Sequence, residues 1–116
     1  MTDVRAMLVG KVNDVWTRRV ETISSDALGE GEVLIAVEYS CINYKDGLST
    51  TEKGKVARID PLIPGVDLAG TVVESSDASI AVGAKVIVHG NDIGVAHNGG
   101  FATMARVPAK WVIPMP

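Results

Sequence analysis

The side chains best suited to chemistry in this sequence gather in a run at residues 43–46 and at a separate carboxylate, Asp67. The phenol hydroxyl of Tyr44 can donate a hydrogen bond or a proton to a substrate that develops negative charge. Asp67 stands between apolar residues in a strand pattern, where a carboxylate is costly unless it is hydrogen-bonded or faces a cleft. Tyr44 and Asp67 are therefore our catalytic candidates. Asp67 either fixes the polar groups of a cleft or lies at a solvent-exposed strand edge.

The residue content argues against a zinc site. The chain has one cysteine, Cys41, and two histidines, His89 and His97. Catalytic zinc takes three protein ligands and structural zinc takes four, and no cysteine accompanies either imidazole at ligand spacing. We expect no metal, and we expect Cys41 to be a small buried side chain rather than a nucleophile.

Composition narrows the class of protein. The chain has 116 residues, 47% of them hydrophobic, and a net charge of −3, which fits one domain with its own core. No basic field is present to neutralise nucleic-acid phosphates. No apolar stretch approaches the roughly 20 residues of a membrane span, and the N-terminal residues do not resemble a leader. A lone thiol fits a reducing compartment, so we expect a cytoplasmic protein that binds neither nucleic acid nor membrane.

The elements that must position these residues are mostly short strands. Alternation and apolar runs predict strands over residues 5–12, 14–23, 32–42, 66–74, 85–89 and 101–107. The strand over 32–42 is dense enough in apolar residues for burial on both faces, and Gly70 indicates a bulge or a close backbone approach. A short helix is predicted over 44–52, a functional loop over 90–100 and an extended segment over 108–116. The pattern predicts a β-barrel or rolled sandwich. The sequence does not contain the dinucleotide-binding unit, in which a strand is followed by a GxGxxG turn and a helix.

Three motifs in this order resemble a known family: NYKD at residues 43–46, IPGVDLAGTV at 63–72, and NGGFA at 98–102 ahead of a strand that ends near Val107. Together they resemble the N-terminal, GroES-like catalytic part of the medium-chain dehydrogenase/reductase superfamily. The similarity is greatest to the zinc-independent branch that contains quinone oxidoreductases and acrylyl-CoA reductases. The resemblance covers essentially the whole chain.

The resemblance implies a mainly β fold, a GroES-like partly open β-barrel with one or two short helices, over residues 1–116. It also implies that a Rossmann domain binding NADPH follows in the whole enzyme and is absent from this stretch, so that the stretch alone is inactive. The implied reaction is NADPH-dependent reduction of an activated C=C bond, in an acrylyl-CoA-type thioester or a quinone, by a homodimer. The alternative is a non-enzymatic GroES-like module for binding or assembly, because a fold alone does not fix function.

The resemblance also suggests roles for individual residues. It places Tyr44 beside the cofactor, and Asn43 either contacts the nicotinamide or caps the helix. Arg58 either meets the phosphates of a CoA substrate or belongs to a solvated basic loop. His97 and Asn98 either line the substrate pocket or lie in a surface loop.

Zinc-dependent relatives offer a contrast at two positions. They carry cysteine where this chain has Asn43, and Gly-His-Glu where it has Gly65, Val66 and Asp67. The resemblance therefore implies catalysis without zinc.

Overall fold

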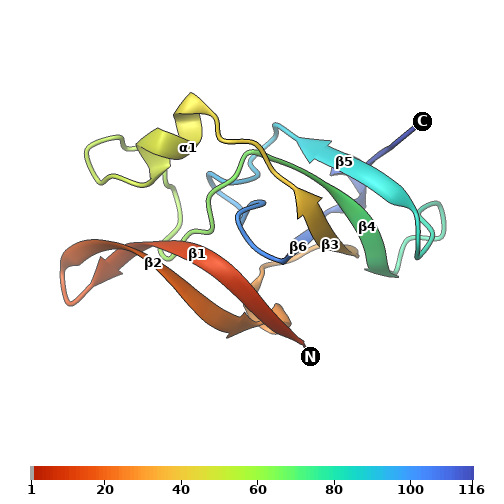
Figure 1. The fold of residues 1–116 in the computed structure, drawn as a ribbon, viewed down its shortest axis with the longest axis horizontal. Coiled ribbons are helices and arrows are strands. Elements are labelled where there is room, and N and C mark those ends of the chain that lie inside the picture. The colour runs from red at the N-terminus through yellow and green to blue at the C-terminus, as the bar shows by residue number, and fades with distance from the viewer. Residues whose placement is uncertain (1) are drawn as a thin grey trace.

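The computed structural model describes residues 2–116, which fold into a two-stranded sheet and a five-stranded sheet (Figure 1). The strands are β1 (Asp3–Val12), β2 (Val15–Ser24), β3 (Val33–Tyr39), β4 (Asp67–Ser75), β5 (Lys85–His89), β6 (Met104–Val107) and β7 (Ile113–Pro114). The helical elements are α1 (Tyr44–Ser49) and two single 3-10 turns, η1 (Ser25–Ala27) and η2 (Ala109–Trp111). The larger sheet has the order β6-β3-β4-β5-β7, and all its pairs are antiparallel.

The β1–β2 hairpin forms the second sheet and lies across one face of the first. Its two-residue turn, Asn13 and Asp14, has φ of 51° and 64°, the left-handed pair that matches the twist of a tight hairpin. Strand β1 then hydrogen-bonds to segments outside the hairpin, with Val9 exchanging both backbone bonds with Leu62 (2.8 and 2.9 Å). These bonds, and that from the N–H of Met7 to the carbonyl of Phe101 (2.9 Å), join the hairpin to the segments that precede β4 and β6. The expected mainly β, partly open barrel is confirmed.

Strand β3 lies between two hydrophobic cores. Val33 and Ile35 belong to the cluster that β4, β5 and β6 share, whereas Leu34 points into the cluster under β1. All three side chains are at most 1% exposed. Burial on both faces, predicted from the apolar density of this segment, is confirmed, and it anchors the strand whose end carries the candidate site.

Gly70 in β4 allows the two central strands to approach closely. A Cβ at this position would lie 2.1 Å from the carbonyl oxygen of Ala36 on β3. The ladder between β3 and β4 shifts register between Val37 and Tyr39, close to the pairing of Val37 with Gly70. Both features anticipated for Gly70, the bulge and the close approach, are therefore present at the point where β3 turns toward the site.

Four elements are shorter or different from the prediction, and one of them is the strand expected over 101–107, which begins only at Met104 as β6. Strand β3 ends at Tyr39, and the N–H of Cys41 then donates to the side chain of Asp67 instead of to the backbone of a neighbouring strand. Helix α1 ends at Ser49, and Thr50 closes its last turn with a bond to the carbonyl of Gly47 (3.3 Å). The segment expected to be extended at 108–116 contains η2 and then adds β7 to the edge of β5.

Gly47 weakens helix α1 without any packing reason. It lies in the middle of the helix, and a Cβ placed there would meet nothing within 4 Å. We expect Gly47→Ala to raise the free energy of unfolding by about 0.5–1 kcal/mol, because alanine loses less backbone entropy in a helix. Urea unfolding monitored by circular dichroism checks this value, and an unchanged or lowered stability would contradict it.

Candidate active site

The candidate site lies where β3 ends and β4 begins. These strands run antiparallel, so residues 40–46 after β3 pass beside Asp67 at the first position of β4. The hydroxyl of Ser40 donates to the backbone carbonyl of Asp67 (2.7 Å), and the N–H of Cys41 donates to its Oδ1 (2.8 Å). Asp67 therefore fixes the path of the chain as it leaves the sheet.

The second oxygen of Asp67 orients Asn43. The side-chain amide of Asn43 donates to Asp67 Oδ2 at 3.0 Å and lies 3.4 Å from Oδ2 of Asp46. Two carboxylates near the same end of the amide require that end to be the NH₂ group, since the amide oxygen would be repelled. Asn43 also serves as the N-cap residue of α1, the capping role considered for it from sequence. Asp67 thus satisfies its charge with hydrogen bonds, which is how a carboxylate survives in a strand.

Asp46 fastens α1 to the turn that precedes β4. Its side chain is 1% exposed, and its Oδ1 accepts the backbone N–H groups of Gly65 and Val66, both at 3.1 Å. Its Oδ2 accepts the N–H of Asn43 (2.8 Å), which is half of a capping box. The Asp46 carboxylate therefore joins the motif at residues 43–46 to the motif at residues 63–72, and Asp46 and Gly65 are 19 residues apart in sequence.

The site opens onto a face with large exposed side chains. Tyr39, Ile42 and Tyr44 are 75%, 86% and 84% exposed. Two depressions flank the segment that carries them. One of about 290 Å³ is lined by residues that include Cys41, Asp67 and His89, and the other, of about 520 Å³, lies between Tyr39, Ile42 and the Gly100–Thr103 segment. The phenol of Tyr44 is thus accessible beside a hydrogen-bonded and rigid loop.

Glu38 provides a charged border to this face. Its Oε1 accepts a hydrogen bond from Nζ of Lys85 (2.8 Å) and another from the hydroxyl of Thr71. The Lys85 ammonium, and after it the Thr71 hydroxyl, hold the pKa of the Glu38 carboxyl below its ordinary value. Glu38 consequently stays ionised and is already paired, so it does not act as a proton donor near neutral pH.

His97 and Asn98 do not join the Asn43–Asp67 group. The two ring nitrogens of His97 lie 2.8 Å from the carbonyl oxygen of Asn98 and 2.9 Å from that of Glu30, and its ring packs edge-on against Trp111. Oδ1 of Asn98 accepts the N–H of Ile63 (2.8 Å), while its NH₂ group reaches the carbonyl of Leu28 (3.3 Å). Their polar atoms therefore tie the 90–100 loop to residues 27–30 and to the 61–65 turn.

Arg58 lies on the loop after α1, away from the same group. Its backbone N–H donates to the carbonyl of Val95 (2.9 Å), and its side chain is exposed. Lys53 and Lys55, on the same loop, are exposed as well. The basic loop anticipated from sequence is present, with its charges directed to solvent.

Cys41 differs from the expectation. It is exposed instead of buried, and it makes no disulfide. The bond from its backbone N–H to Asp67 turns residue 41 out of the sheet, because β3 has already ended at Tyr39.

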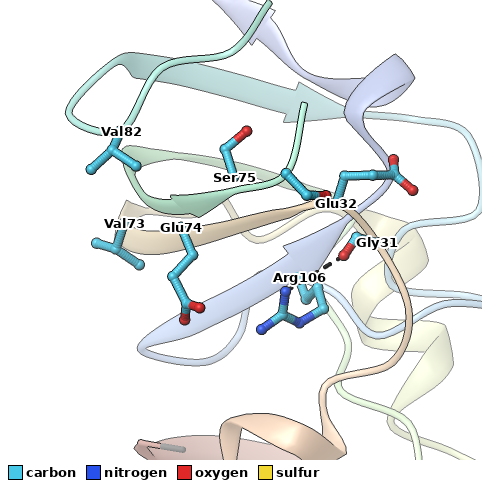
Figure 2. Close-up of a pocket in the computed structure, with 8 residues that line it drawn as sticks. Gly31, Glu32, Val73, Glu74, Ser75, Val82 and Arg106 are labelled. Atoms are coloured by element: carbon cyan, nitrogen blue, oxygen red, sulfur yellow. Dashed lines mark hydrogen bonds between the residues drawn. The ribbon is translucent and has the colours of Figure 1, made fainter. Parts of the chain in front are cut away.

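A further depression lies at the opposite end of the sheet, where β3 starts and β4 and β6 end (Figure 2). Figure 2 shows Glu32, Glu74 and Arg106 around it, with Arg106 directed to the carbonyl of Gly31 at 3.5 Å. None of the residues that line it is a sequence-predicted site residue. The depression of about 290 Å³, by contrast, is lined by the predicted site residue Asp67, and we place the candidate site there.

Known proteins share this fold and these motifs. Residues 29–116 match the alcohol dehydrogenase GroES-like domain family, and the chain belongs to that family. YhfP of Bacillus subtilis, assigned by name to the quinone oxidoreductases, is 44% identical over 112 residues, which are 97% of this chain and 34% of that protein. The acrylyl-CoA reductase AcuI of Ruegeria pomeroyi is 46% identical over 97 residues, 84% of this chain and 29% of that protein. Both relatives are therefore matched by this chain over about a third of their own length or less.

Two solved structures carry a nicotinamide cofactor. The structure of Bacillus subtilis YhfP with NAD bound is 43% identical and superposes with a TM-score of 0.94, covering 100% of this chain and 35% of that one. The structure of Escherichia coli YhdH with NADPH bound is 40% identical and superposes with a TM-score of 0.90. The match covers 96% of this chain and 34% of that one. The chain spans about a third of the length of these relatives.

No membrane-crossing helix is found in residues 2–116, where the single α-helix has six residues.

Proposed function

We propose that this chain is the substrate-side domain of an oxidoreductase that uses NADPH to reduce an activated C=C bond. The preferred substrate is an enoyl thioester such as acrylyl-CoA, with a quinone as the alternative acceptor. The observation that carries the proposal is the Asp67–Asn43 pair at 3.0 Å, which holds a rigid loop so that Tyr44 projects onto an open face. The similarity to an acrylyl-CoA reductase and to a relative that binds NADPH supports it.

We also propose that a Rossmann domain outside this stretch binds most of the NADPH, so that residues 1–116 are inactive alone. The exposed side chains of Tyr39, Ile42 and Tyr44 support this, because isolated domains rarely leave such an apolar group uncovered. Homodimeric assembly of the whole protein follows the family resemblance. A cytoplasmic location is proposed on the exposed free thiol of Cys41, which suits a reducing compartment.

The residues of the open face fit a nicotinamide. Asn43 offers a polar amide held in place by Asp67, and the same segment carries the exposed side chains of Tyr44 and Ile42. A ring with two apolar faces and one carboxamide matches that mixture. We assign Asn43 and Tyr44 to the contact with the cofactor, which supplies a hydride to the β-carbon of the enoyl thioester when it is bound.

The chain's own residues manage charge and protons during this reduction. As the C=C bond is reduced, negative charge develops on the thioester oxygen, and a proton must be added at the α-carbon. Tyr44 donates a hydrogen bond to that oxygen or the proton itself. Asp67 acts through Asn43 and Cys41, so we describe it as a positioning residue.

The substrate-binding candidates divide into two kinds. Arg58 keeps its guanidinium in solvent and stays our candidate for contacting the phosphates of a CoA thioester. His97 and Asn98, whose polar atoms are used within the chain, are proposed to shape the pocket wall by holding the 90–100 loop.

The proposed role of Tyr44 is tested by NADPH oxidation with acrylyl-CoA, using the longer protein that contains this chain. We expect Tyr44→Phe to lower kcat about 10–100-fold with a smaller change in KM, because the lost interaction acts on the developing charge. Thr22→Val is the control, since it removes an exposed hydroxyl on β2 that lines neither depression of the candidate site. It should leave the rate unchanged. Equal rates for Tyr44→Phe and the wild type would remove Tyr44 from the mechanism.

A further inference from the structure

A groove on the outer side of α1 is lined by an indole and by two basic side chains. It has a volume of about 600 Å³ and lies between the start of β2 and the loop that follows α1. In Figure 1 this loop extends from α1 over the turn of the β1–β2 hairpin. The groove contains none of the site residues predicted from sequence.

An indole forms the aromatic wall of the groove. Trp16 of β2 is half-buried, and its Nε1–H donates to the carbonyl of Thr50 at 2.8 Å. This bond fixes the ring between the hairpin and the loop. A fixed indole is a good partner for a purine, because stacking of a base on an aromatic side chain tolerates any base and needs no hydrogen bond.

Two cations border the indole. Arg18 and Lys53 both line the groove, are exposed, and make no salt bridge within the described residues. The acidic residue of the groove, Glu52, is already paired with Nζ of Lys11 at 2.9 Å, and this contact raises the pKa of Lys11. The positive charge is notable in a chain with a net charge of −3. It suits a phosphate, which a guanidinium binds in bidentate fashion.

The neutral polar groups of the groove are already used. The hydroxyls of Thr50 and Thr51 donate to the carbonyls of Gly47 and Leu48, at 2.7 and 3.1 Å. Recognition therefore depends on ring stacking and charge. That combination selects a nucleotide carrying phosphates rather than a sugar or a peptide.

The groove lies one short helix from the candidate site. Helix α1 joins Asn43 and Tyr44 at its start to Thr50 at its end, and its six residues span about 9 Å. The extended pantetheine arm of a CoA thioester is longer than that. A nucleotide bound at Trp16 therefore leaves enough reach for its thioester to arrive at Tyr44.

We propose that Trp16, Arg18 and Lys53 form the binding site for the 3′-phosphoadenosine end of an acyl-CoA substrate. The assignment rests on the proposed function for the choice of an acyl-CoA. It places the adenine against the indole and the 3′-phosphate against the two cations, and it leaves the diphosphate of the CoA to Arg58.

Calorimetric titration of the chain with CoA, adenosine 3′,5′-bisphosphate, adenosine 2′,5′-bisphosphate and pantetheine tests the site. We expect CoA and the 3′,5′-bisphosphate to bind with similar affinity and pantetheine to bind at least about tenfold more weakly, since it lacks both ring and phosphate. The Trp16 indole N–H signal, assigned with Trp16→Phe, should shift in the nitrogen–proton spectrum on addition of either nucleotide. An unmoved signal at saturation, or tighter binding of the 2′,5′-bisphosphate carried by NADPH, would overturn the assignment.

The double variant Arg18→Glu/Lys53→Glu should raise the Kd for CoA at least about tenfold, because both phosphate contacts become repulsive. Lys110→Glu, at an exposed lysine of η2, is the matched control and should bind CoA as the wild type does. An unchanged Kd in the double variant would reject the site.

Kinetics of the longer protein separate this inference from the proposed function. In the double variant the KM for acrylyl-CoA should rise while the KM for a quinone, which has no nucleotide, stays constant. If the double variant reduces acrylyl-CoA with an unchanged KM, the groove does not bind the CoA nucleotide, and the proposed function still holds. If CoA binds at Trp16 but the longer protein reduces no enoyl thioester, the proposed function is wrong, and the assignment of the groove to CoA still holds.

Discussion

Replacing Asp46 with alanine should lower the free energy of unfolding by about 3–5 kcal/mol. The substitution removes an ionised acceptor and leaves the N–H groups of Asn43, Gly65 and Val66 without it. Gly65 is buried, so water cannot easily replace the lost bond there. Urea unfolding of the chain measures the difference.

Asp3→Ala is the matched control for this prediction, because Asp3 is an exposed aspartate at the beginning of β1. It should change stability by less than about 0.5 kcal/mol. If Asp46→Ala cost no more than Asp3→Ala, the buried carboxylate would not be what joins α1 to the turn before β4.

Gly65→Ala should cost about 3–5 kcal/mol for a different reason, which combines backbone strain and collision. Gly65 has φ of +105°, and a Cβ there would lie 2.7 Å from the backbone nitrogen of Gly100 and 2.8 Å from that of Phe101. The same two N–H groups donate to the carbonyls of Gly65 and Pro64, at 3.0 Å each. The turn cannot move away without breaking them. Thermal and urea unfolding both report this loss.

Gly83→Ala separates the two contributions. Gly83 has φ of +93°, but a Cβ there would meet nothing within 4 Å. Its replacement should therefore show strain alone, about 1–2 kcal/mol. If Gly65→Ala and Gly83→Ala lowered the free energy of unfolding equally, the collision with residues 100 and 101 would be relieved without any loss of stability.

Much of the fold could be predicted from local patterns. The apolar density of residues 33–35 predicted burial on both faces, and Gly70 predicted the close approach of β3 and β4. Element ends were harder to place. Strand β3 stops early because Asp67, distant in sequence, offers the next backbone N–H a better partner than a strand does. Such a competitor cannot be found from the segment itself.

The candidate site could be predicted in part. The motif at residues 43–46 and the costly carboxylate at 67 identified two segments that the structure brings together. The sequence did not reveal that His97 and Asn98 bond across 67 to 71 residues to the chain between 27 and 30. A polar residue in a glycine-rich loop carries no sign of whether its partner is a ligand or a distant carbonyl.

The groove at Trp16 was missed entirely. Its one local signal was a tryptophan in a strand of polar and charged residues, next to the adjacent pair Arg18 and Arg19. The partners Thr50 and Lys53 come from the far end of α1, more than 30 residues later. Only the folded arrangement shows that one of the two arginines, Arg18, faces this groove, whereas Arg19 pairs with Glu21.

The central claim is that reduction takes place at a site organised by the Asp67–Asn43 pair, without a catalytic zinc ion. The family resemblance sets Asn43 and Asp67 opposite residues that zinc-dependent relatives use as ligands, and here the Asn43 amide donates to Oδ2 of Asp67 at 3.0 Å. The most direct measurement is NADPH oxidation with acrylyl-CoA by the longer protein, before and after exhaustive chelation with metal analysis of the same sample. The account predicts the same kcat in both states with less than stoichiometric zinc. Loss of activity on chelation that stoichiometric zinc restores would contradict it.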